Sequence, residues 1–145
     1  MPTRVRIVIP GDDPPQLQST AQLDRLRNYG DVALFSDRPA SDVEKIERCR
    51  GAACLINSRS AVKWPAPVLE RLPDLKMITV CGIGTDAIET EAARKLGIIV
   101  CNIPAQTAPI VAEHALGLMF AVARGAWYQT DLVKPVCYQY RSCSI

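Results

Sequence analysis

The chain has 145 residues, a net charge of +2 and 22% charged residues of both signs. This length suits about one domain with its own core, and the balanced charge argues against a nucleic-acid-binding surface. The six cysteines form no C-x-x-C pair and there is one histidine, so no metal site is expected. Without a signal-peptide pattern, we expect a cytoplasmic protein in which Cys54, Cys81 and Cys101 act as small hydrophobes in or at the ends of buried strands.

The first half of the chain alternates between short apolar runs, typical of strands, and segments with helical periodicity. Ser41 or Asp42 can cap the second helix, and Glu44 fits a capping box with Ser41. Gly30 and Gly51 are expected to end the first and second helices. The expected strands are Val5–Ile9, Asp31–Phe35 and Ala53–Ile56, and the first and third helices are Ser19–Tyr29 and Pro67–Leu72.

The segment Leu75–Asn102 predicts a strand, a glycine turn, a helix and another strand with little slack. Leu75–Cys81 and Ile98–Val100 are apolar runs that we expect to be buried on both faces, as parallel strands are. The helix Thr90–Leu96 has Thr90 as its N-cap candidate and Gly97 as its end. Alternating strands and helices predict an open parallel sheet covered by helices.

Ligands bind such sheets at the carboxyl ends of the strands. The segments expected along that edge are 10–13, 57–60, 81–86 and 102–106. After Asn102 the pattern changes, because Ile110–Ala123 predicts a helix that is apolar almost all round. This helix is too short to span a bilayer and contains Glu113 and His114. It must dock on another domain or form a self-association surface.

The turn Gly82-Ile83-Gly84 is the first candidate site. Glycines allow a positive φ and let an anion approach the main-chain N–H groups, but the same turn can be a plain strand-to-helix link. It is not the G-x-G-x-x-G of a dinucleotide site, since Ala87 follows Asp86. Arg59, after the third strand, could add a charge-assisted hydrogen bond to the same anion or be an ordinary surface arginine.

Five other polar residues have a weaker claim to a functional role. Asn57 and Ser58 could bind a polar substrate or form an Asx or Ser turn. Asp12 and Asp13 follow the first strand as acidic pairs do in phosphate-accepting receiver domains, but the third strand ends in Asn57 instead of an acceptor Asp. A solvated turn therefore explains them better. His114 lies inside the apolar helix, where a structural role is favoured over a general base.

Four motifs in order are specific to one family: G-x-G-x-D at Gly82–Asp86, A-A-x-x-x-G-I at Ala92–Ile98, N-x-P at Asn102–Pro104 and V-A-E-H-A at Val111–Ala115. With them the chain resembles the D-isomer-specific 2-hydroxyacid dehydrogenases, which include phosphoglycerate, glycerate and D-lactate dehydrogenases. The resemblance covers roughly residues 5–124. It implies a flavodoxin-like substrate domain, with helices on both faces of the sheet, over residues 1–102. A hinge and a long apolar helix of a NAD-binding domain would follow over 103–124.

The resemblance also implies roles for single residues. The main-chain N–H groups of Gly82, Ile83 and Gly84 would hold the substrate carboxylate, and Arg59 matches a substrate-binding position. Ile83 and Thr107 would lie near the nicotinamide of NAD or NADP. The helix 110–123 would support a homodimer, and the substrate would be a small 2-hydroxy or 2-keto acid.

The chain departs from the family pattern in its last part. The family's downstream G-x-G-x-x-G and its catalytic Arg, Glu and His are all absent, and the tail 125–145 does not continue the family pattern. We therefore expect the substrate-domain part of an NAD(P)-dependent oxidoreductase, truncated before its cofactor domain and inactive alone. The alternatives are a dimerisation or interaction module, or a product with no function of its own. Sequence does not say which hydroxy acid is bound, or NAD against NADP.

Overall fold

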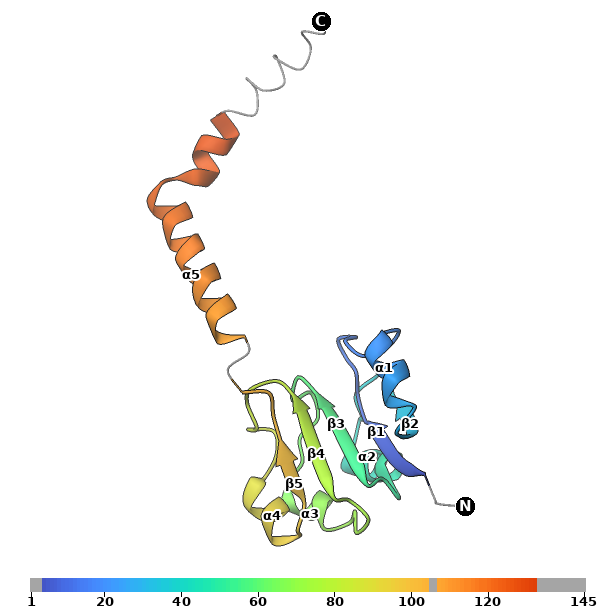
Figure 1. Cartoon of the computed structure of the whole chain (residues 1–145). Helices are drawn as coiled ribbons and strands as arrows, with labels where there is room; N and C mark the ends of the chain where they lie inside the picture. Colours follow the sequence, from blue (N-terminus) through green and yellow to red (C-terminus); the bar gives the residue numbers. More distant parts are fainter. Residues whose placement is uncertain (1–3, 105–106, 133–145) are drawn as a thin grey trace, which may run out of the picture. The chain divides into compact units, whose positions relative to one another are not determined.

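The computed structural model describes residues 4–104 and 107–132 and divides the chain into two compact units, Met1–Pro104 and Ala105–Ile145. The first unit is the expected alternation of strands and helices (Figure 1). Its strands are β1 (Val5–Ile9), β2 (Gly30–Leu34), β3 (Cys54–Ser58), β4 (Met77–Cys81) and β5 (Ile99–Cys101). Its helices are α1 (Ala21–Leu26), α2 (Asp42–Cys49), α3 (Ala66–Leu69) and α4 (Thr90–Lys95).

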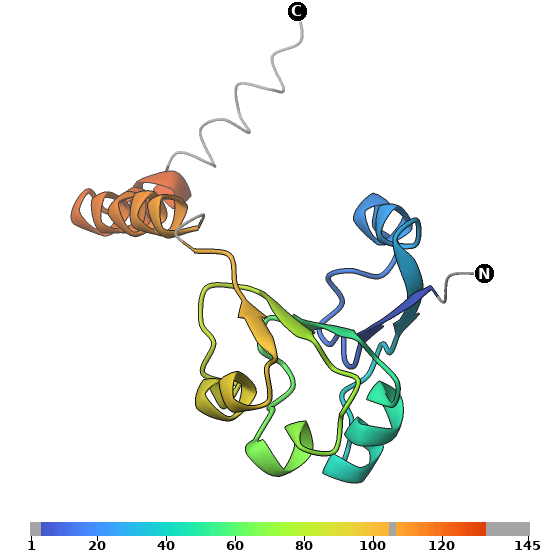
Figure 2. The ribbon, with the colours of Figure 1, turned by 60° about the horizontal axis from the view of Figure 1, so that its bottom comes forward.

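The five strands form one parallel sheet in the order β2-β1-β3-β4-β5. This is the flavodoxin-like order, whose direction of winding reverses between β1 and β3. Figure 2 shows α1 on one face of the sheet and α2, α3 and α4 on the other. The predicted fold class, with helices on both faces, is confirmed.

The main core lies between the sheet and the three helices α2, α3 and α4. Val8, Leu55 and Ile78, from the three central strands, are completely buried, and Trp64 is the largest fully buried side chain. The smaller core under α1 contains Ile7, Ile9, Leu23 and Ile56. Two-sided burial of β1 and β3, which contribute buried residues to both cores, explains why their sequences read as apolar runs.

The prediction that the two strands of segment 75–102 are buried on both faces is wrong. β4 alternates between buried and half-buried residues, and β5 is mostly exposed, with Cys101 among its exposed residues. β5 is an edge strand, so it has a neighbour on one side only. The predicted burial of Cys101 is therefore also wrong, whereas Cys54 and Cys81 are half-buried free thiols.

Some of the predicted helix-capping and helix-ending residues have the expected role in the structure, and others do not. Ser41 caps α2 by accepting from Glu44 N–H at 3.2 Å, but the Glu44 carboxylate accepts from Ala40 N–H. Thr90 is the first residue of α4 instead of its cap. Gly30 begins β2 instead of ending α1, which ends at Leu26. A glycine is needed at this position because a Cβ would lie 2.4 Å from the Val5 carbonyl oxygen.

The second unit contains α5 (Ala108–Ala123), which confirms the predicted apolar helix. No α5 residue is buried, and Phe120 and Val122 are 67% and 75% exposed. No helix among the described residues has the length and hydropathy needed to cross a membrane. The predicted tail 125–145 lies outside the described residues from residue 133 onward.

Candidate functional site

In the turn after β4, the main-chain carbonyl oxygens accept hydrogen bonds from other loops, whereas the main-chain N–H groups donate to no described residue. The Gly82 oxygen accepts from Ile103 N–H at 2.9 Å, and the Ile83 oxygen accepts from Asn102 Nδ2 at 2.7 Å. The Gly84 oxygen accepts from the Ser60 hydroxyl at 3.2 Å. Within the part of the chain that the structure describes, the N–H groups of Gly82, Ile83 and Gly84 donate to no other residue. Consecutive unpaired N–H groups are what an anion-binding turn needs.

A positive φ is not the reason for these glycines, because neither Gly82 nor Gly84 has one. A Cβ at Gly82 would meet only Val80 Cγ1 at 3.8 Å, so there is room for a side chain. At Gly84 a Cβ would lie 2.9 Å from Asp86 Oδ2, which shows that the Asp86 carboxylate lies against this residue. Here the glycines leave the N–H groups uncovered.

Two consecutive positive φ angles occur instead in the loop after β3, at Arg59 (φ +47°) and Ser60 (φ +56°). Such a conformation costs a non-glycine residue about 1–2 kcal/mol. Asn57 holds the loop: its Nδ2 donates to the Val62 oxygen at 2.9 Å, and its Oδ1 accepts from Val62 N–H at 3.2 Å. Strained backbone of this kind persists where the surroundings over-determine it, often at functional sites.

Asn57 and Ser58 do not face a substrate. Both are the last residues of β3 and are buried, at 0% and 2% exposure. Asn57 uses both side-chain atoms on Val62, five residues further on, and Ser58 donates its hydroxyl to Asp12. Both residues have structural partners, but neither forms the local Asx or Ser turn that was the alternative to substrate binding.

The prediction of a solvated turn is wrong for Asp12, which is fully buried. Its carboxylate accepts from the N–H groups of Gln16, Leu17 and Gln18 at 2.8–3.1 Å. Burial by itself would raise the Asp12 pKa, but the donors Gln18, Leu17, Gln16 and Ser58 outweigh burial and hold that pKa below its ordinary value. Asp12 therefore joins the loop after β1 to the end of β3.

No cluster of three or more metal-ligating side chains occurs within residues 4–104 or 107–132. Thr107 precedes α5 in the second unit, and its predicted place near a nicotinamide stays a prediction. His114 lies within α5 and is exposed. Asp12 was missed as a site-building residue because an aspartate after a strand usually signals a turn at the surface.

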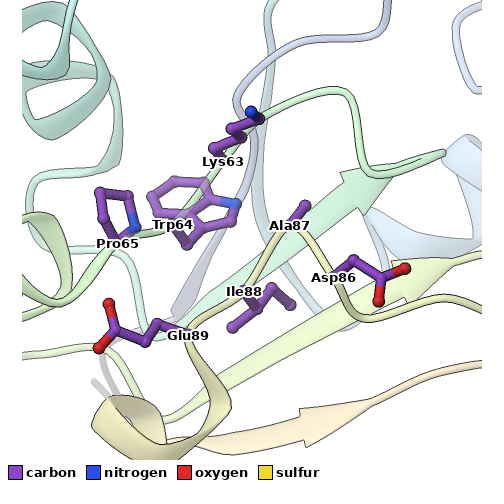
Figure 3. Close-up of a pocket in the computed structure, with 7 residues that line it drawn as sticks. All are labelled: Lys63, Trp64, Pro65, Asp86, Ala87, Ile88 and Glu89. Carbon is purple, nitrogen blue, oxygen red and sulfur yellow. The ribbon is translucent and has the colours of Figure 1, made fainter.

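A cleft of about 360 Å³ lies beside the glycine turn, between residues 63–65 and 86–89 (Figure 3). Lys63 is its one cation, whereas Asp86 and Glu89 are anions. Glu89 Oε2 accepts from Ala66 N–H at 3.0 Å at the start of α3. This excess of negative charge suits an anionic acid poorly, and the Asp86 carboxylate also lies against Gly84 of the glycine turn.

The comparison with protein families decides the identity of the chain. The model of the D-isomer specific 2-hydroxyacid dehydrogenase catalytic domain matches residues 12–139. The chain belongs to this family. The family resemblance read from the motifs of residues 82–115 is thus confirmed.

Individual relatives agree. The chain is 38% identical over 106 residues to the glycerate dehydrogenase of Methylorubrum extorquens, covering 66% of this chain and 32% of that one. It is 42% identical over 91 residues to the D-3-phosphoglycerate dehydrogenase of Methanocaldococcus jannaschii, covering 63% and 17%. The chain thus spans a third or less of these curated relatives.

A solved structure shows the same fold. It is the NADPH-dependent glyoxylate/hydroxypyruvate reductase from Sinorhizobium meliloti, determined in complex with NADP and malonate. The TM-score is 0.63 at 25% sequence identity, and the match covers 82% of this chain and 34% of that one.

Proposed function

We propose that this chain is the substrate-binding part of an NAD(P)-dependent 2-hydroxyacid dehydrogenase, and that Gly82, Ile83 and Gly84 bind the carboxylate of a 2-hydroxy or 2-keto acid. The observation that carries this proposal is the turn with three unpaired N–H groups and three engaged carbonyls. A carboxylate accepts several N–H hydrogen bonds, and charge strengthens each of them.

Arg59 supplies the positive charge for this site. The next residue, Ser60, donates to the Gly84 oxygen, so the loop after β3 is attached to the glycine turn. The loop after β5 is attached to the same turn through Asn102 and Ile103. The loops after β3 and β5 therefore both attach to the turn after β4, at the carboxyl end of the sheet, where parallel sheets bind their ligands.

Only residues at the edge of the proposed site would contact a nicotinamide cofactor. Ile83 is 46% exposed and offers an apolar side chain against which a flat ring can pack. Thr107 is the second residue that would lie near the ring. The cofactor, when bound, would supply hydride exchange with the 2-carbon; this chain's residues would hold the acid and its orientation. The sequence has no G-x-G-x-x-G to hold a pyrophosphate.

Titration of the ¹⁵N-labelled chain with D-glycerate tests the carboxylate site. We expect the amide resonances of Gly82, Ile83 and Gly84 to shift, and uncharged glyceramide to leave them in place. Arg59→Ala should weaken D-glycerate binding about tenfold, which is the loss of one charge-assisted hydrogen bond. Equal shifts with glycerate and glyceramide would contradict a carboxylate site.

A second candidate function is self-association through the helix 110–123, as a homodimer. It is supported by an apolar surface on all sides of α5, of which no residue is buried. Sedimentation velocity over roughly a hundredfold range of concentration tests it. We expect Phe120→Glu to dissociate the dimer and Tyr29→Glu, at a 74% exposed aromatic residue of the first unit, to leave it intact. A wild-type chain that stays monomeric throughout would refute it.

A further inference from the structure

The loop after β1 carries a glutamine whose side chain reaches the proposed substrate arginine. The amide of Gln16 lies 3.1 Å from Nε and 3.3 Å from Nη1 of Arg59. A guanidinium only donates hydrogen bonds, so the atom facing it is assigned as the amide oxygen. One edge of the Arg59 guanidinium is thus held, while its Nη2 donates to no other residue that the structure describes.

Both ends of this contact are fixed by one buried group. The Asp12 carboxylate accepts from the Gln16 N–H at 3.1 Å and from the hydroxyl of Ser58, the residue before Arg59. The contact therefore spans β1 and β3, between which the winding of the sheet reverses. Ligands of doubly wound sheets bind at this switch point.

The arginine needs such a support. Arg59 is exposed and follows the last residue of β3 with a left-handed backbone, so its long side chain has little packing to hold it. A free arginine side chain must give up rotamer freedom when it binds an anion, and a preformed one has already done so. A neutral amide is suited to this task because it orients the guanidinium without cancelling its charge.

We propose that Gln16 is a positioning residue for Arg59, holding the guanidinium so that its free edge meets the anionic substrate. The proposal rests on the function proposed above, in which Arg59 contacts the acid. Gln16 itself need not touch the substrate.

The exchange of the Arg59 Nε proton with solvent, followed by ¹⁵N NMR, measures the contact without any ligand. We expect the Arg59 Nε proton to exchange roughly threefold to tenfold faster in Gln16→Ala, because this factor corresponds to the free energy of one lost hydrogen bond to a charged group. Gln16→Glu should keep exchange slow, because its carboxylate accepts from the same edge. Gln18→Ala is the matched control: its N–H also donates to Asp12, and its side chain bonds to no described residue.

D-glycerate affinity, taken from the Gly82–Gly84 amide shifts, measures the consequence. We expect Gln16→Ala to weaken binding by about threefold to tenfold, and Gln18→Ala to leave it unchanged. Unchanged Nε exchange in Gln16→Ala would overturn the proposal, as would faster exchange with unchanged affinity. If D-glycerate does not shift the Gly82–Gly84 amide resonances of the wild-type chain, the proposed carboxylate site is refuted. The exchange rates then still show whether Gln16 holds Arg59.

Discussion

Asp12 shows how one buried carboxylate can organise a site that it does not enter. A buried charge is tolerated when hydrogen bonds replace its lost water. Asp12 receives three main-chain N–H groups and the Ser58 hydroxyl, and these keep its pKa low. Its effect at the site is indirect, because it fixes the loop that carries Gln16 and the strand end before Arg59.

Asp12→Asn should lower the free energy of unfolding by about 2–3 kcal/mol at neutral pH, because an amide is a weaker acceptor and turns an N–H group toward the loop's donors. Since folding lowers the Asp12 pKa, its stabilisation is present above the ordinary value of 3.8 and is lost as the pH falls below it. The difference in free energy of unfolding between Asp12→Asn and the wild type should therefore become smaller at acid pH.

Denaturant unfolding at several pH values measures this difference. Asp13→Asn is the control, because the Asp13 side chain is 53% exposed and pairs only with Arg38 at the surface. It should change stability by less than about 0.5 kcal/mol. A gap between Asp12→Asn and wild type that stays constant down to the acid transition would contradict the assigned role.

At the scale of elements, α2 is held to the sheet by a buried arginine as well as by its apolar face. Arg48 is 8% exposed and donates to the carbonyl oxygens of Pro10 and Asp37 at 3.0 and 2.8 Å. It also pairs with the Asp37 carboxylate, which holds the Asp37 pKa below its ordinary value, and lies over the Phe35 ring. One side chain thus ties α2 to the loops after β1 and β2.

Arg48→Ala should lower the free energy of unfolding by about 2–3 kcal/mol, because two loop carbonyls lose their charged donor. Arg50→Ala is the matched control two residues further on. Arg50 is 72% exposed and pairs with Glu47 on the surface, so its loss should cost less than about 1 kcal/mol. Thermal or denaturant unfolding compares the two variants, and equal losses would show that burial of Arg48 has no special effect.

For the first unit as a whole, the order of the strands brings together loops that are far apart in sequence. The loops after β1, β3, β4 and β5 all begin at the same edge of the sheet, because all the strands are parallel and their carboxyl ends lie together. Hydrogen bonds link these loops in series: Asp12 with Ser58, Ser60 with Gly84, and Asn102 with Ile83. The candidate site is therefore a property of the sheet and not of a single motif.

The purified chain should show no NAD- or NADP-dependent oxidation of D-glycerate, because its 145 residues contain no G-x-G-x-x-G and no counterpart of the family's downstream Arg, Glu and His. The appearance of reduced nicotinamide, followed by absorbance, is the measurement. The glycerate dehydrogenase of Methylorubrum extorquens serves as the positive control under the same conditions. Turnover by the chain alone would refute the assignment of a substrate-binding role without catalysis.

Local chemistry was sufficient to predict much of this protein from its sequence. Apolar runs gave the strands, Ser41 gave the start of α2, and the motifs of residues 82–115 gave the family. These features depend on residues close together in the chain, where periodicity and capping act. The exposure of β5 was not predictable in this way, since an edge strand and a central strand can have the same apolar sequence.

The arrangement around Arg59 was decided only by the tertiary structure. Neither the burial of Asp12 nor the contact between Gln16 and Arg59 has a local signal, because each joins segments separated by more than forty residues. The sequence by itself determined the strands, the helices and the glycine turn with its family motif. The pairing of β1 with β3 determined which polar side chains meet at that turn's edge of the sheet, since only pairing sets which strand ends are neighbours.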